Sequence, residues 1–228
     1  MLEKLKEEVY LANLELVKKG LVILTWGNVS GRDEETGFVV IKPSGVSYEK
    51  MKPSDMVVVN LDGKVIEGDL NPSSDTLTHL EIYKAHPEIK GITHTHSFYA
   101  TAYAQSGQAL KCYGTTHADY FYGDVPITRV LTKEEVEEGY ELNTGRIINE
   151  VVKDPLACPA VLVNNHGPFT FGKSAMHSVE VAQVLEYCCG LAINMKSVNP
   201  NQKEIASHIK DKHYFRKHGP NAYYGQKK

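Results

Sequence analysis

The stretch GITHTHSFYATAYAQSG, residues 91–107, carries the strongest signal in the sequence. An apolar run ends in His94 and His96, and the small and aromatic residues that follow predict a helix with Ser97 as its N-cap. On a strand, residues two apart point to the same face, so the two imidazoles would lie side by side at a strand end. Such a pair suits a metal ion. Two polar residues facing water would give the same pattern.

A second apolar run, AVLVNNHGPF, also ends in a histidine. We predict a short strand that ends at His166, with Gly167 allowing a sharp turn. Asp75, within NPSSDT, is a candidate carboxylate ligand, although an aspartate before a helix is also a common N-cap. Three histidines, with or without a carboxylate, suit Zn²⁺ or another divalent ion whose open positions polarise a carbonyl or a diol.

The rest of the chain predicts an α/β fold. Helices are expected over residues 2–19, 76–87, 97–107, 132–152, 174–198 and 200–219. Hairpins are expected over 28–41 and 56–68, and further strands over 88–96, 124–131 and 159–167. The links between strands are too short for a regular doubly wound parallel sheet. We therefore expect a central, mostly antiparallel sheet flanked by helices.

Composition narrows the class of protein. The 228 residues are 42% hydrophobic and 23% charged, without linker or repeat, which predicts one domain over residues 1–228. The net charge of −3 gives no nucleic-acid-binding face. There is neither a secretory-type start nor an apolar run of membrane-spanning length. The four cysteines show no CxxC spacing. These features predict a reduced, cytoplasmic protein with no membrane partner.

Phosphate-binding signals are of an unusual kind, because the chain has no P-loop and no GxGxxG. Three small-residue turns and a nearby lysine stand out instead: Gly27-Asn28, Ser44-Gly45, Ser73-Ser74 and Lys42. Backbone N–H groups, hydroxyls and a helix N-terminus can together hold a phosphate. Each turn on its own is more typical of an ordinary loop.

Two further segments carry more polar and aromatic residues than structure alone requires. GTTHADYFYGD, residues 114–124, places Asp119 beside aromatic residues, and the tail RKHGPNAYYGQ, residues 216–226, contains Tyr223 and Tyr224. A disordered tail would seldom keep such aromatics. We expect the tail to dock on another surface, such as a neighbouring subunit.

In this order, the motifs resemble those of the class II aldolase/adducin superfamily and, within it, the L-ribulose-5-phosphate 4-epimerases. They are GNVS (27–30), KPSGV (42–46), PSSDT (72–76), HTHS (94–97), GTTHADYFYG (114–123), NHGPF (165–169) and KHYFRKHG with AYYGQ (212–226). The resemblance covers nearly the whole chain and implies a single-domain class II aldolase-like fold. It also implies a metal-dependent isomerase of arabinose- or ascorbate-type pentose catabolism that interconverts L-ribulose 5-phosphate and D-xylulose 5-phosphate.

The resemblance also implies roles for individual residues. His94, His96 and His166 would hold Zn²⁺, with Asp75 as a fourth ligand and Mn²⁺ or Co²⁺ as alternative ions. Asp119 and Tyr224 would be the proton-transfer pair. Substrate contacts would come from Gly27, Asn28, Lys42, Ser44, Gly45, Ser73 and Ser74, supported by Thr116 and His213. The assembly would be a homotetramer with sites between subunits, and the reaction would break and re-form the C3–C4 bond.

Two other readings compete with the epimerase. A class II sugar-phosphate aldolase, such as fuculose- or rhamnulose-phosphate aldolase, would share the metal and the bond cleavage. The fuculose-phosphate aldolase pattern has Glu as a base where this chain has Asp75, which favours the epimerase. A non-enzymatic, adducin-type binding module would lack the metal ligands, whereas all three histidines are present here.

Overall fold

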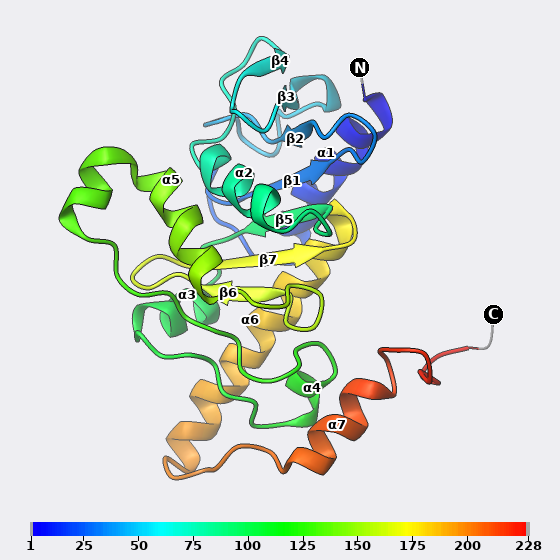
Figure 1. Ribbon diagram of the computed structural model, residues 1–228, viewed down its shortest axis with the longest axis vertical. Coiled ribbons are helices and arrows are strands. Elements are labelled where there is room, and N and C mark those ends of the chain that lie inside the picture. The colour runs from blue at the N-terminus through cyan, green and yellow to red at the C-terminus, as the bar shows by residue number, and fades with distance from the viewer. Residues whose placement is uncertain (1, 227–228) are drawn as a thin grey trace.

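The computed structural model describes residues 2–226, and its strands form one seven-stranded sheet in the order β4-β3-β2-β1-β5-β7-β6 (Figure 1). The strands are β1 Asn28–Arg32, β2 Val39–Ile41, β3 Val57–Val59, β4 Val65–Glu67, β5 Gly91–His94, β6 Ala160–Leu162 and β7 Pro168–Gly172. All neighbouring strands pair antiparallel. The predicted α/β fold with an antiparallel sheet is confirmed.

Helices cover both faces of this sheet. They are α1 Glu3–Lys18, α2 Thr76–Ala85, α3 Phe98–Gln105, α4 Thr115–Ala118, α5 Lys133–Val151, α6 Ala175–Val198 and α7 Ser207–Phe215, with a 3-10 turn η1 at Pro53–Asp55. Figure 1 shows α2 and α5 on one face and α1 and α6 on the other. Within residues 2–226, no helix is long and apolar enough to cross a membrane.

The alternation of side chains along each strand produces these layers. Val57 and Val59 of β3 pack in the same cluster as Leu80 of α2, whereas Val58 packs on the other face with Val9 of α1. Because successive residues of a strand point to opposite faces, a strand covered on both sides must be apolar throughout. The run Val57–Val59 meets that condition.

Strand β7 was not predicted, although it lies at the centre of the site-bearing half of the sheet. The expected strand through His166 stops at Leu162, and the chain turns back through Asn165, whose φ is 61°. Gly167 is therefore not the residue that makes the turn. It must be glycine because a Cβ there would lie 2.7 Å from the Thr95 carbonyl oxygen.

Three other predicted boundaries were wrong. The segment 124–131 forms isolated bridges at Val125 and Ile127 rather than a strand, because each residue pairs with a different segment. β5 ends at His94, two residues earlier than expected. The last helix is shorter than 200–219, because the Ile205 N–H donates to the Cys112 carbonyl before the helix begins.

Helix capping shows where local sequence decides and where packing does. Thr132 and Glu135 form a capping box at the start of α5, in which Thr132 N donates to Glu135 Oε2 at 2.8 Å. Ser97 occupies the N-cap of α3, but its side chain caps nothing. Instead, Glu186 of α6 accepts two N–H bonds of 2.8 Å from the first turn of α3. This contact anchors the segment that follows His96.

Gly91 generates the first prediction, because β5 passes very close to the start of α6. A Cβ at Gly91 would lie 2.6 Å from the Ala175 nitrogen and closer still to the Ser174 carbonyl. We expect Gly91→Ala to lower the free energy of unfolding by about 1–3 kcal/mol, measured by urea denaturation. Gly114→Ala is the control, since nothing lies within 4 Å of that position. Equal stability of the two variants would contradict the close approach.

Candidate active site

Three histidines converge where β5 ends and β7 begins, at one end of these two interior strands. His94 ends β5, His96 lies two residues further on, and His166 lies in the turn between β6 and β7. Their potential ligand atoms all lie within 4.8 Å of one another, and their ring centroids are 4.7–5.0 Å apart. The three residues therefore meet as predicted, although His96 and His166 lie in loops rather than on strands.

Neighbouring groups fix how two of the imidazoles point. His94 Nδ1–H donates to the Pro168 carbonyl at 3.0 Å, and its ring stacks on Phe169 at 4.3 Å. This bond engages Nδ1 and leaves Nε2 as the ring nitrogen of His94 that can bind a metal. His166 Nδ1 lies 3.3 Å from the Tyr140 hydroxyl. Each ring thus keeps its second nitrogen for another partner.

The burial of His96 and His166 favours the neutral form of both imidazoles. Burial, reinforced by His94, lowers the pKa of His96 to about 4 and that of His166 to about 3. These imidazoles are therefore neutral at pH 7, and neutral imidazole is the form that binds metals. Three converging imidazoles fit a zinc-like divalent ion.

Asp75 lies beside the histidines but not among the three converging residues. It occupies the N-cap position of α2 without a side-chain capping bond, and its Oδ2 accepts from Asn28 Nδ2 at 2.6 Å. Burial opposes its ionisation, but His94, His79 and the Asn28 bond outweigh burial and lower the pKa of Asp75. The carboxylate is therefore available at neutral pH. Its role as a fourth ligand stays a prediction.

A cavity of about 500 Å³ opens next to these groups. His96, His166, Asp75, Tyr140 and Glu141 contribute to its lining. Seven of the nine residues predicted to contact substrate line it too, all except Thr116 and His213: Gly27, Asn28, Lys42, Ser44, Gly45, Ser73 and Ser74. Three turns that are far apart in the sequence thus meet in one place. Their function as a phosphate site stays a prediction.

Lys42 is a buried cation at the wall of this cavity. It is only 2% exposed, and its Nζ contacts the Pro43 carbonyl at 3.3 Å and the face of the Tyr48 ring at 4.9 Å. Within residues 2–226 it forms no ion pair, and burial lowers its pKa. A buried charge without a partner is costly, so an anion in the cavity would supply the missing countercharge.

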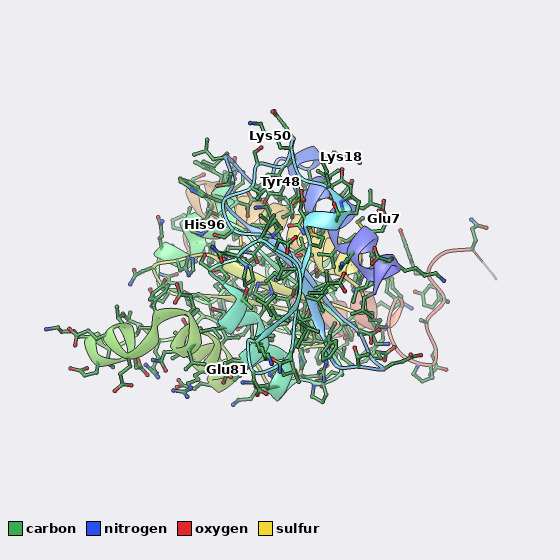
Figure 2. All side chains as sticks on the ribbon, turned by 90° about the horizontal axis from the view of Figure 1, so that it is seen from above. Glu7, Lys18, Tyr48, Lys50, Glu81 and His96 are labelled. Atoms are coloured by element: carbon green, nitrogen blue, oxygen red, sulfur yellow. The ribbon has the colours of Figure 1, made fainter. Side chains whose placement is uncertain are left out.

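Tyr48 is a site residue that the sequence reasoning missed. Its hydroxyl donates to the carbonyls of Trp26 and Gly27, at 2.9 Å each, while its ring supports Lys42. In Figure 2, Tyr48 lies within the mass of side chains, whereas Lys50 projects outward. Its position two residues after KPSGV was the available signal. Its contacts join segments more than 20 residues apart, and no local pattern reports them.

Tyr140 and Glu141 were also missed, although both line the cavity. They follow Gly139, whose backbone is not helical and interrupts α5. The sequence predicted one regular helix here, because a single glycine within a helical pattern is tolerated and does not indicate an interruption. The interruption places the second part of α5 beside His166.

The remaining predicted residues form a second group. Asp119, at the C-terminal end of α4, binds Arg216 at 2.8 Å, Lys217 at 3.2 Å and His213 at 3.1 Å. Thr116 and Asp119 line a separate cavity of about 730 Å³. None of these residues lines the cavity beside the histidines.

The C-terminal tail folds back on Arg216, at the end of α7 in its own chain, and the expected docking on another surface stays a prediction. The Tyr224 ring lies over Arg216 at 5.1 Å and Lys217 at 4.4 Å, and Tyr223 covers Lys212. Both tyrosines remain 63% exposed. The pair proposed for proton transfer, Asp119 and Tyr224, therefore belongs to one surface cluster.

Comparison with known families agrees with this architecture. Residues 7–193 match the family described as the class II aldolase and adducin N-terminal domain. The chain therefore belongs to the class II aldolase and adducin family.

Solved structures with the same fold include several aldolases. An L-fuculose 1-phosphate aldolase is 26% identical with a TM-score of 0.78, covering 92% of this chain and 94% of its own. The L-fuculose 1-phosphate aldolase from Glaciozyma antarctica PI12 is 23% identical with a TM-score of 0.75, covering 96% and 84%. YgbL from Klebsiella pneumoniae, for which aldolase, epimerase and decarboxylase activities have each been suggested, is 24% identical with a TM-score of 0.73, covering 93% and 99%.

The Tyr48 contacts generate the second prediction. Tyr48→Phe keeps the ring beneath Lys42 but leaves the Trp26 and Gly27 carbonyls without their donor. We expect stability to fall by about 1 kcal/mol and inorganic phosphate to bind about fivefold more weakly, measured by thermal unfolding and calorimetry. Tyr187→Phe, at a side chain 61% exposed, is the control. Unchanged phosphate affinity in Tyr48→Phe would rule out a role for Tyr48 in shaping the cavity.

Proposed function

We propose that this protein is a divalent-metal-dependent L-ribulose-5-phosphate 4-epimerase that interconverts L-ribulose 5-phosphate and D-xylulose 5-phosphate. The observation that carries the proposal is the meeting of three histidines, three small-residue turns and the buried Lys42 at one cavity. A metal group beside an anion-binding wall suits a short phosphorylated sugar. The epimerase motifs, including Asp rather than Glu at position 75, select this activity within the family.

The proposed ion is Zn²⁺, with Mn²⁺ or Co²⁺ as alternatives, held by His94, His96 and His166 with Asp75 alongside. When bound, the ion supplies a Lewis acid that stabilises negative charge developing on the substrate oxygens.

The cavity wall has the second task, which is to hold the phosphate. Lys42 supplies positive charge, and Ser44, Ser73 and the backbone of the Gly27 and Gly45 turns supply hydrogen-bond donors. Cleavage of the C3–C4 bond leaves glycolaldehyde phosphate as a separate fragment. A phosphate held by these groups keeps the fragment in place while its carbonyl turns to present the other face.

Proton transfer needs one group on each face of C4. One group takes the C4 hydroxyl proton as the C3–C4 electron pair moves toward C2. The second group returns a proton to the C4 oxygen once the bond re-forms on the opposite face. We assign these tasks to Asp119 and Tyr224. Because they line no part of their own chain's histidine cavity, we propose that they serve a neighbouring subunit in a homotetramer.

A class II sugar-phosphate aldolase is the second candidate, favoured by the similarity to L-fuculose 1-phosphate aldolase. Both candidates share the metal group and the anion cavity. They differ in the fate of the aldehyde, which an epimerase retains and an aldolase releases.

The deciding experiment follows L-ribulose 5-phosphate in a coupled assay for D-xylulose 5-phosphate, with free glycolaldehyde phosphate measured in parallel. We expect metal-dependent epimerisation with little free aldehyde, abolished by a chelator and restored by Zn²⁺, Mn²⁺ or Co²⁺. His94→Asn and His166→Asn should lose bound metal and activity, while His208→Asn, at an exposed position, should keep both. Release of aldehyde and dihydroxyacetone would favour the aldolase.

Subunit mixing tests the shared site. His166→Asn and Asp119→Asn should each be nearly inactive, with losses of about 10²–10⁴-fold for the proton-transfer variant. Hybrid oligomers of the two, purified with separate tags after co-expression, should regain activity, because some sites combine intact histidines with an intact Asp119. Hybrids of His166→Asn with His94→Asn are the control and should stay inactive. Inactive hybrids in both cases would place Asp119 and its target cavity in one chain.

A further inference from the structure

Arg216 contacts both members of the proposed proton-transfer pair. Its guanidinium binds the Asp119 carboxylate on one side and lies beneath the Tyr224 ring on the other. It is the C-cap residue of α7, the helix that packs against α4 beside Asp119 (Figure 1). A single side chain therefore joins two segments separated by about 100 residues in sequence.

The contact with Asp119 is the most geometrically specific in the cluster. Nη2 donates to Oδ1 at 3.0 Å and to Oδ2 at 2.8 Å, and Nε donates to Oδ1 at 3.2 Å. A planar guanidinium that engages both carboxylate oxygens fixes their orientation, which a single ammonium contact does not. Lys217 and His213 each reach only one oxygen.

The contact with the tail uses both the backbone and the side chain. The Arg216 carbonyl accepts from the N–H groups of Tyr223 and Tyr224, at 2.9 Å each. The guanidinium carbon lies 5.1 Å from the Tyr224 ring centroid, within the range of a cation–π interaction. The tail therefore folds back at Arg216, and the place of the Tyr224 ring depends on it.

We infer that Arg216 is the positioning residue that holds Asp119 and Tyr224 in one rigid unit, so that both reach the reaction site with a fixed separation. This inference rests on the proposed function for the roles of the pair. Arg216 lines neither the histidine cavity nor the separate cavity at Asp119. It therefore acts through the pair rather than on the substrate.

The charges around Asp119 set the sign of a pH effect. His213, Arg216 and Lys217 face the carboxylate, and His218 contacts the Asp119 backbone carbonyl. Burial raises the pKa of Asp119, but the bonds from Arg216, Lys217 and His213 outweigh burial and lower it. In the reaction direction in which Asp119 accepts a proton, the carboxylate must be ionised. Activity therefore falls as the pH drops through the pKa of Asp119. Loss of Arg216 raises the pKa of Asp119. On acidification, the variant should therefore lose activity at a higher pH than the wild type does.

The test compares Arg216→Gln and Arg216→Lys with Lys210→Gln, a change on the same helix at a side chain that contacts Tyr122. We expect Arg216→Gln to lower kcat on the order of 10-fold, less than the loss of a whole acid–base group, with little change in KM. The acid limb of its pH–rate profile should move up by about one pH unit. Arg216→Lys keeps the positive charge but loses the planar guanidinium that engages both carboxylate oxygens. Its acid limb should therefore lie close to that of the wild type, while its kcat stays low.

A second measurement does not depend on activity. Hydrogen exchange of the peptide covering residues 216–226 should be faster in Arg216→Gln than in the wild type and in Lys210→Gln, because the tail loses its side-chain anchor. If exchange or the acid limb stays at the control value, Arg216 acts on at most one member of the pair and the inference is overturned. If the wild type shows no epimerisation while Arg216→Gln still releases the tail, the proposed function fails and the anchoring stands.

Discussion

The pairing of β5 with β1 on one side and β7 on the other is the constraint on which the site depends. Its register sets His94 opposite Asn28 on β1 and opposite Phe169 on β7. The same two partners then act on the site, since Asn28 binds Asp75 and Phe169 stacks on the His94 ring. A slip of one residue would turn His94 to the other face and separate these contacts. The register of the backbone hydrogen bonds thus determines which residues surround His94 and Asp75.

Local sequence predicted features whose causes are local. The hairpins over 28–41 and 56–68 and the helix that begins after Thr132 depend on nearby residues, and each was found. Strand β7 was missed because PFTFG is only five residues long and begins with proline, and its place between β5 and β6 is what makes it a strand. A contact between remote segments also explains the capping of α3. Glu186, 89 positions from Ser97, accepts the N–H groups that Ser97 was expected to cap.

The candidate site divides in the same way. Motif resemblance located the histidines and the three turns, because each is a short contiguous signature. Tyr48, Tyr140 and Arg216 escaped it, because what they do is visible only when remote segments meet. These three residues hold other site residues in place: Tyr48 supports Lys42, Tyr140 contacts His166 and Arg216 binds Asp119. Sequence reasoning therefore found the residues that converge at the candidate site better than the residues that orient them.

The burial of Lys42 without an ionic partner among residues 2–226 also affects the stability of the protein. A cation buried without an ionic partner makes the ligand-free fold less stable than its packing alone would allow. An anion that binds only the folded chain returns that stability, by about 2.7 kcal/mol at a concentration 100 times its dissociation constant. A bound anion would therefore also lower the fraction of molecules that unfold and become open to proteolysis.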